Sequence, residues 1–161
     1  MNFFVKAVLA VFSLLLVAAC DTDPSGYGSA DGSGGVSGSA TPGSQSDLEQ
    51  NVGDRVFFNL DSSQLTEEAQ STLGRQAAWL KQYPHLNLTI EGHCDERGTR
   101  EYNIALGERR ANSAKKYLMN LGISSNRLAT ISYGKERPAI IGSDESAWSQ
   151  NRRAVSVATN Q

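Results

Sequence analysis

The chain has 161 residues, of which 39% are hydrophobic and 20% charged, and its formal charge at pH 7 is −2 with a pI near 5.7. This composition is ordinary for a globular protein, and the length allows one domain with appended segments. The charge gives no long-range attraction to DNA, RNA or an anionic membrane, each of which favours a strongly basic face. We therefore expect no nucleic-acid partner.

The first twenty residues, MNFFVKAVLAVFSLLLVAAC, carry one positive charge, at Lys6, before an apolar run over 7–19. The run is too short to span a bilayer comfortably and is typical of the apolar region of a secretory signal. Its end, VAAC, resembles the bacterial lipoprotein signal, in which a lipidated cysteine becomes the first residue of the mature protein. We expect residues 1–19 to be a signal peptide and Cys20 to carry lipid such as palmitate. The alternatives are an ordinary signal peptide with a nearby cysteine and an uncleaved anchor.

Residues 21–46, DTDPSGYGSADGSGGVSGSATPGSQS, contain seven glycines and seven serines and have no hydrophobic period. Such a composition is typical of a flexible linker and cannot bury a core. We expect residues 20–47 to form the lipidated cysteine and a tether with an r.m.s. span on the order of 30 Å. Such a tether gives the following domain reach without a fixed orientation, although a spacer of no further consequence is equally compatible with this composition.

The domain predicted over 48–161 begins with a strand and a helix. The stretch DRVFFNLD is rich in aromatic and β-branched residues and predicts a strand over 54–58. Thr66, which precedes two glutamates, is a good helix N-cap, and Pro84 stops the helix that follows. Apolar residues recur between them with helical spacing, at Ala69, Leu73, Ala77 and Leu80.

The rest of the domain continues the alternation of strands and helices. Alternating apolar residues predict a strand over 86–92, and a helix over 100–120 follows, with Gly122 as its C-terminal breaker. Two more strands are predicted over 126–134 and 152–159, separated by a loop with a short helical turn. The order β-α-β-α-β-β predicts an α/β fold with the helices packed on one mixed sheet.

The segment GHCDERGTREYNIALGERRA, residues 92–111, is densely charged and joins a strand end to a helix, where α/β folds often bind ligands. Asn103, Leu106 and Arg110 are spaced i, i+3 and i+7 and share one helix face, which Asp95 can approach. Opposite charges on a rigid element suit a zwitterionic ligand, with the arginine binding its carboxylate. The alternative is a solvated face of weak salt bridges, which we expect for the segment's other charged residues.

The runs GHCDERGTREYNIALGERRANSAKKYL, ISYGKERPAIIG and NRRAV closely resemble the OmpA-like C-terminal domain family, over residues 52–157. The resemblance implies a two-layer α/β sandwich that binds peptidoglycan noncovalently through the diaminopimelate of the stem peptide, which carries ammonium and carboxylate groups. It implies that Asp95 binds the ammonium and Arg110 a carboxylate. It further implies a pocket lined by Asn103 and Leu106, edged by Asp61, and supplied with backbone groups by Arg97, Gly98 and Thr99.

For the lipid-anchored members, the resemblance implies an outer-membrane protein of the Tol system that ties the membrane to the cell wall and supports envelope integrity and constriction at division. The implied protein partners are TolB, the periplasmic propeller, and TolA. Asp21, which directly follows Cys20, departs from this picture, because aspartate at that position is associated with inner-membrane retention in enteric bacteria. Outer-membrane placement is therefore expected from the resemblance and not from the sorting residue.

An enzyme is the rival class, because His93, Cys94, Asp95 and Glu96 stand in a row. Consecutive residues of an extended strand point to opposite faces, zinc sites use separated ligand pairs, and a catalytic cysteine and histidine are not normally adjacent in sequence. We therefore expect no catalysis, metal or cofactor, and a tolerated thiol at Cys94, which would have no disulfide partner if Cys20 is lipidated.

A third class is a pure protein-interaction module, in which exposed charges such as Arg100, Glu101 and Arg109 would contact the Tol partner. Trp148 is the other candidate for such a contact, because aromatic residues are favoured at interfaces. We nevertheless expect it to be a core residue or a loop anchor and not an exposed hot spot.

Overall fold

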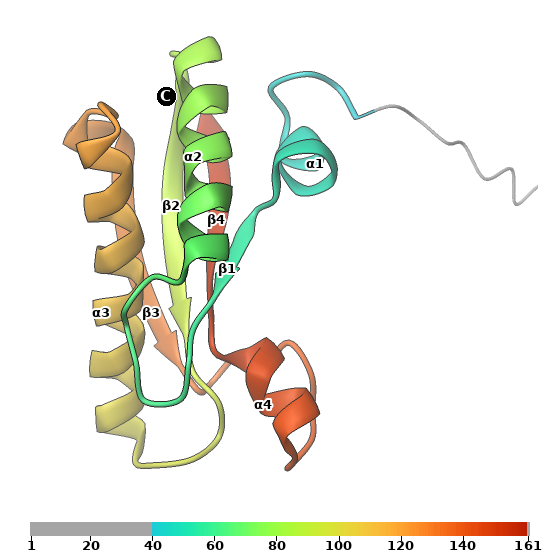
Figure 1. The fold of residues 1–161 in the computed structure, drawn as a ribbon, viewed down its shortest axis with the longest axis vertical. Coiled ribbons are helices and arrows are strands. Elements are labelled where there is room, and N and C mark those ends of the chain that lie inside the picture. Colours follow the sequence, from blue (N-terminus) through green and yellow to red (C-terminus); the bar gives the residue numbers. More distant parts are fainter. Residues whose placement is uncertain (1–39, 161) are drawn as a thin grey trace, which may run out of the picture. The chain divides into compact units, whose positions relative to one another are not determined.

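The computed structural model describes residues 40–160 (Figure 1). The predicted signal peptide, Cys20 and most of the tether lie outside these residues. The elements in chain order are α1 (Gln45–Asp47), the π-helical turn η1 (Leu48–Val52), β1 (Arg55–Phe57), α2 (Glu67–Gln82), β2 (Leu86–His93), α3 (Arg100–Asn120), the 3₁₀ turn η2 (Ser125–Arg127), β3 (Leu128–Gly134), α4 (Glu145–Asn151) and β4 (Arg153–Asn160). This order confirms the predicted β-α-β-α-β-β sequence, with α4 as the short helical turn before the last strand.

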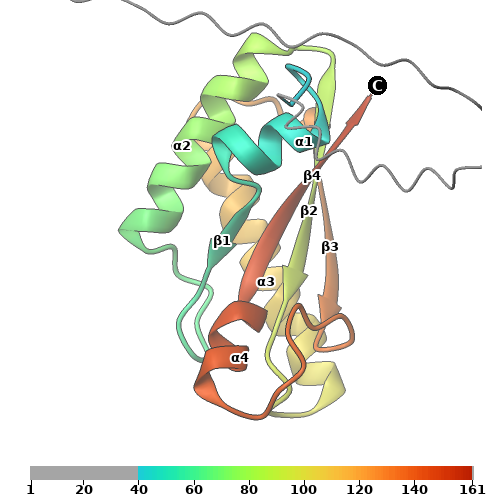
Figure 2. The ribbon, with the colours of Figure 1, turned by 90° about the vertical axis from the view of Figure 1, so that its right-hand side faces the viewer.

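The four strands form one mixed sheet in the order β1-β4-β2-β3. β2 and β3 are parallel and are joined through α3, whereas β4 runs antiparallel to both β1 and β2. Figures 1 and 2 show α2 and α3 on one face of this sheet, which is the predicted two-layer arrangement. The opposite face is open to solvent, so that Phe57 and Ile131 are exposed there.

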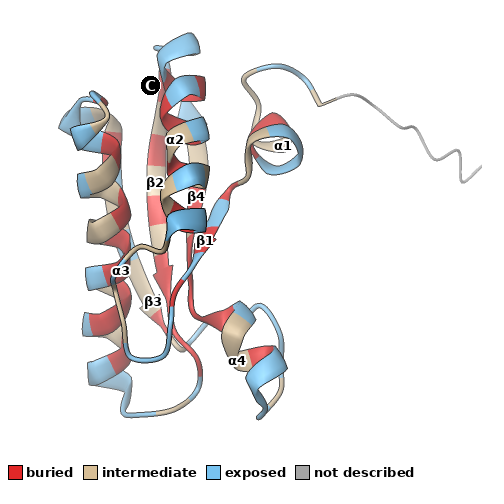
Figure 3. Cartoon of the chain, in the orientation of Figure 1, coloured by how far each residue is buried: buried red, intermediate tan, exposed pale blue. Residues whose placement is uncertain are grey.

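The core lies between the sheet and the two long helices, where buried positions line their facing surfaces (Figure 3). The four apolar residues that predicted α2 by their spacing are all buried, and Thr66 caps the helix by accepting a hydrogen bond from the Ala69 N–H at 3.2 Å. Strand β2 buries every second residue along most of its length, as its alternating pattern predicts. Hydrophobic periodicity therefore accounts for both layers.

Helix α3 lies unusually close to β2 because two glycines face each other. A Cβ added at Gly92 would lie 1.9 Å from the carbonyl oxygen of Gly107, a separation that backbone atoms cannot tolerate. Any side chain at position 92 would therefore push the helix away from the sheet. The contact holds the N-terminal half of α3 beside the end of β2, where the candidate site is found.

The folded part of the chain begins before residue 48, the predicted domain boundary. The Trp79 indole N–H donates to the buried carboxylate of Asp47 at 2.8 Å. That carboxylate also accepts hydrogen bonds from the Asn51 side chain and the Gly43 N–H, each at 2.8 Å. The pKa of Asp47 lies below its ordinary value, and the hydrogen bond from Asn51 contributes most to this lowering. Residues of the predicted tether are thus fixed to the domain by polar contacts.

Replacing Trp79 with phenylalanine should lower the free energy of unfolding by about 2 kcal/mol, because a hydrogen bond to a charged, buried carboxylate is lost. Urea denaturation would measure this change. Tyr83→Phe is a matched control, since it removes a hydroxyl from the ring that lies 5.4 Å from Trp79 between centroids. Equal losses in the two variants would show that the Asp47 contact adds no stability.

Candidate functional site

A pocket of about 220 Å³ opens at the end of β2, between the loop over 94–99, the first turns of α3 and the loop that follows β1. It is lined by Leu60, Asp61, Cys94, Asp95, Arg97, Gly98, Tyr102, Asn103, Leu106 and Arg110. Every residue predicted for the peptidoglycan site borders it except Thr99. Leu60, Cys94 and Tyr102 also line the pocket but were not predicted as site residues.

Helix α3 presents Asn103, Leu106 and Arg110 to the pocket, as their i, i+3, i+7 spacing predicts, and all three are buried. Thr99 instead caps the helix, because its hydroxyl accepts a hydrogen bond from the Tyr102 N–H at 3.2 Å. The Asn103 amide donates to the carbonyls of Arg97 at 2.7 Å and Thr99 at 3.0 Å. Asn103 therefore shapes the loop that forms one wall of the pocket.

Arg110 is almost completely buried, with 1% of its surface exposed, and its guanidinium is anchored to three backbone carbonyls. Nε donates to Ser62 at 2.8 Å, Nη1 to His93 at 2.8 Å and Nη2 to Asn59 at 3.2 Å. Burial lowers the pKa of the guanidinium from its ordinary value, although arginine remains charged at neutral pH. Three of its five N–H groups are thus used, which leaves one on each terminal nitrogen.

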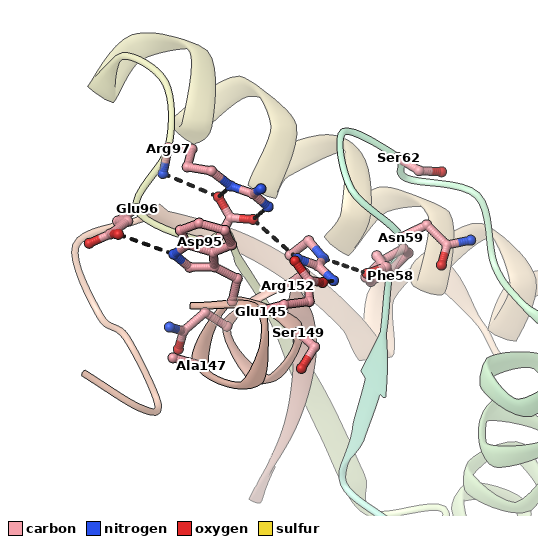
Figure 4. A network of polar contacts seen from close by, with 12 residues as sticks. Phe58, Asn59, Ser62, Asp95, Glu96, Arg97, Glu145, Ala147, Ser149 and Arg152 are labelled. Atoms are coloured by element: carbon pink, nitrogen blue, oxygen red, sulfur yellow. Dashed lines mark hydrogen bonds and ion pairs between the residues drawn. The ribbon is translucent and has the colours of Figure 1, made fainter. Parts of the chain in front are cut away.

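Asp95 is buried but is not an open carboxylate, because two arginines contact it (Figure 4). Oδ1 accepts from the Arg97 backbone N–H at 3.1 Å and from its Nε at 3.2 Å. Oδ2 accepts from Nη2 of Arg97 at 2.6 Å and from Nη1 of Arg152 at 3.4 Å. Burial alone would raise the pKa of Asp95, but the hydrogen bonds from Arg97 outweigh it, so the pKa lies below its ordinary value.

Arg152 belongs to this network although the sequence analysis did not select it. Its side chain is buried beneath Asp95, where Nε donates to the Phe58 carbonyl at 3.1 Å and Nη2 pairs with the Glu145 carboxylate (Figure 4). It thereby joins the end of β1, the pocket loop and α4. The sequence pattern that could have identified Arg152 is the pair of adjacent arginines at the start of a buried strand, because a buried charge needs a partner.

Asp61 stands at the pocket edge in a left-handed backbone conformation, with φ of 52°. This conformation is uncommon for residues other than glycine, and aspartate is among the residues that tolerate it best. The Tyr102 hydroxyl donates to its carboxylate, and this bond raises the pKa of the tyrosine. The two residues hold the loop after β1 against the start of α3.

Some of the backbone groups of Arg97, Gly98 and Thr99, which were predicted to be available to a ligand, are already hydrogen-bonded within the protein. The Arg97 N–H is bound to Asp95, and Lys135 donates to the carbonyls of Glu96 at 3.0 Å and Gly98 at 2.7 Å. Within residues 40–160, the loop's N–H groups that donate no hydrogen bond are those of Asp95, Glu96, Gly98 and Thr99.

In the row from His93 to Glu96, only His93 belongs to strand β2, and the expected alternation of sides does not extend beyond it, because Cys94 and Asp95 both line the pocket. His93 lies against Tyr133, with ring centroids 5.5 Å apart, and does not line the pocket. Cys94 donates through Sγ to the Asn103 carbonyl at 3.3 Å, and burial raises the pKa of its thiol. Across residues 40–160 we find no group of three or more histidine, cysteine, aspartate or glutamate side chains arranged to hold a metal ion.

Comparison with known proteins gives the family. The model of the OmpA family matches residues 57–152, most of the described domain. The chain belongs to the OmpA family. Within that family, the peptidoglycan-associated lipoprotein of Rhizobium meliloti (strain 1021) is 53% identical over 93% of this chain and 85% of that protein. The protein of the same name from Haemophilus influenzae is 44% identical over 96% of this chain and 98% of that protein.

Solved structures share the fold of this domain. The peptidoglycan-associated lipoprotein from Burkholderia pseudomallei superposes with a TM-score of 0.64 at 40% identity, over 66% of this chain and 90% of that one. The C-terminal domain of Helicobacter pylori MotB gives a TM-score of 0.62 at 20% identity, over 67% of this chain and 85% of that one, which shows the fold alone. In the OmpA-family domain described here, no helix combines the length and apolarity needed to cross a membrane.

Proposed function

We propose that this chain is an outer-membrane lipoprotein that binds peptidoglycan noncovalently through the diaminopimelate of the stem peptide. The name shared by its relatives, peptidoglycan-associated lipoprotein, supports a role at peptidoglycan, and the pocket at the end of β2 supports the choice of ligand. Binding requires no turnover, and the proposal includes neither catalysis nor a cofactor.

The pocket supports a zwitterionic ligand because it brings both signs of charge together in about 220 Å³. Diaminopimelate ends in a carbon that carries an ammonium and a carboxylate. The two N–H groups that Arg110 keeps on its terminal nitrogens match the two oxygens of a carboxylate. Asp95 and Asp61 lie on the same pocket and attract the ammonium. This pairing of Arg110 with two aspartates is the observation that carries the proposal.

The remaining pocket residues have distinct tasks in this proposal. Leu106 provides an apolar wall for the methylene chain of the ligand, and Asn103 holds the loop over 94–99 in shape through the two carbonyls it binds. The N–H groups of Gly98 and Thr99 are left for ligand oxygens. Thr99 contributes through its backbone, since its side chain caps α3.

In the cell, lipid on Cys20 would hold the protein in the membrane while the tether gives the domain access to the wall. Many weak attachments in parallel maintain contact, because anchoring raises the effective concentration of each binding site. We further propose membership of the Tol-Pal system, with TolB and TolA as partners, and support of envelope integrity and of constriction at division. The names of the relatives support this assignment, whereas Asp21 does not itself direct the protein to the outer membrane.

Asp95→Asn should weaken binding to purified sacculi about tenfold or more, because the ammonium loses its charged partner. A pull-down with increasing amounts of sacculi measures the change. Glu101→Gln removes one negative charge from an exposed position on the first turn of α3 and should bind like the original protein. Thermal melts of both variants check the fold. If Asp95→Asn is folded and binds sacculi as Glu101→Gln does, the assignment of the site is wrong.

A further inference from the structure

The Asp95 carboxylate has no open position for a ligand. Its two oxygens receive four hydrogen bonds, three from Arg97 and one from Arg152, and a carboxylate offers about four lone-pair directions. An ammonium therefore reaches Asp95 only if one of the arginine side chains withdraws.

The two arginines differ in how firmly they are held. The Arg152 side chain is 8% exposed and is fixed from two other sides, by the Phe58 carbonyl and by Glu145. The Arg97 side chain is 33% exposed, lies on a loop, and stacks over the Trp148 ring with its guanidinium carbon 4.0 Å from the ring centroid. Arg97 is therefore the group that can move.

The stacking contact with Trp148 provides a position that the Arg97 guanidinium can keep after it leaves Asp95. A guanidinium on an aromatic face is stabilised by the negative potential of the ring, whether or not it is also paired with a carboxylate. The Trp148 ring is itself held, because its indole N–H donates to the Glu96 carboxylate at 3.1 Å. Arg97 can thus leave Asp95 and remain on Trp148, so its withdrawal does not leave the cation without a partner.

We propose that Arg97 competes with the ligand for Asp95 and thereby lowers the affinity of the pocket for every ammonium group. The proposal rests on the function proposed above. A ligand with a lone ammonium exchanges one ion pair at Asp95 for another and gains little. A zwitterion makes the same exchange and in addition binds the two N–H groups of Arg110. Arg97 therefore sets a threshold of affinity. Diaminopimelate stem peptides exceed it, and stem peptides with lysine at the same position, whose side chain ends in an ammonium alone, do not.

Two synthetic muropeptides that differ only in diaminopimelate or lysine test this inference, with the full-length lipoprotein in detergent and calorimetry as the readout. The original protein should prefer the diaminopimelate peptide about tenfold or more. In Arg97→Gln, Asp95 is free to accept either ammonium, so the affinity for both peptides should rise about fivefold and the ratio of the two affinities should stay the same. Arg97→Lys, which keeps the charge but not the forked geometry, should lie between the two.

Arg100→Gln is the matched control, because this arginine is 66% exposed, pairs with Glu136 and does not line the pocket. It should keep the original affinity for both peptides. Unchanged affinities in Arg97→Gln overturn the inference, and so does a loss of affinity for both peptides, which would make Arg97 a ligand contact. If the original protein binds neither peptide, the proposed function fails and this inference with it. The two failures are therefore distinguishable.

Discussion

Arg110→Met should lower the free energy of unfolding by about 4 kcal/mol. The guanidinium binds the carbonyls of Asn59 and Ser62 in the loop after β1 and that of His93 at the end of β2. Methionine replaces the apolar stem but supplies no donor, so the carbonyls of Ser62 and His93 lose this partner, while that of Asn59 keeps the Ser62 N–H at 3.3 Å. Each such loss costs about 1–3 kcal/mol, and the total is limited because the exposed loop can rearrange toward water.

Urea denaturation of Arg110→Met, compared with that of Arg109→Met, measures the loss of stability that is specific to Arg110. Arg109 is the exposed neighbour on the same helix, and its loss should change stability by less than about 0.5 kcal/mol. Arg110→Lys should lose about half as much as Arg110→Met, because one ammonium cannot reach three carbonyls that a planar guanidinium bridges. A midpoint for Arg110→Met close to that of Arg109→Met would contradict the structural role.

The double role of Arg110 decides which variants can test binding. A variant that loses both its stability and its affinity for sacculi does not separate a missing ligand contact from a distorted pocket. Asp95 is the better probe, because its asparagine variant keeps the shape of the side chain, and Arg152 keeps the Phe58 carbonyl and Glu145 as partners. The binding experiment therefore uses Asp95, and the stability experiment uses Arg110.

Those parts of the fold that depend on local pattern were predictable from the sequence. Helix α3 spans the predicted residues 100–120, because its N-cap Thr99 and the terminating Gly122 are local signals. The pocket face of α3 also followed from spacing alone, since seven residues are almost two helical turns. That Asp95 and Arg110 border one pocket required only that a strand end and a helix start lie side by side.

Contacts between segments distant in sequence were not predictable in the same way. One partner of Asp95 is Arg152, which lies 57 residues away in the sequence. Local hydrophobic periodicity carries no information about such a pair. The burial of Asp47 was missed for another reason. It lies in a polar segment without hydrophobic period, and it is held by hydrogen bonds to Trp79 and Asn51, which composition does not reveal.

His93 should make the protein progressively less stable as the pH falls from 6.5 to about 4. Its ring is buried beside Tyr133 of the neighbouring strand β3, and neither nitrogen has a hydrogen-bond partner among residues 40–160. Burial and the neighbouring charge of Arg153 lower the pKa of His93 to about 4, from an ordinary value of 6.5. The backbone of Arg137 opposes this shift, and the charge of Arg137 adds a smaller lowering, while the Glu91 carboxylate on β2 lies 3.6 Å from Nε2.

The direction of the effect follows from proton binding. Between pH 6.5 and about 4 the unfolded chain protonates this histidine while the folded protein keeps it neutral, so acid favours unfolding. The stabilising effect is complete above pH 6.5, declines through this interval, and is constant below about pH 4. At about 1.4 kcal/mol per pH unit, the interval corresponds to about 3 kcal/mol.

Urea denaturation of the original protein and of His93→Phe, measured from pH 7.5 to 4, tests this expectation. Phenylalanine fills a similar volume and does not titrate, and carboxylates such as Asp47 and Asp95 contribute equally to both proteins. The stability of the original protein relative to His93→Phe should therefore fall by about 3 kcal/mol across the interval. His93→Leu, which is also non-titrating but differs in shape, should give the same slope with a different offset. If the difference between the original protein and both variants is independent of pH, His93 does not bind fewer protons in the folded state.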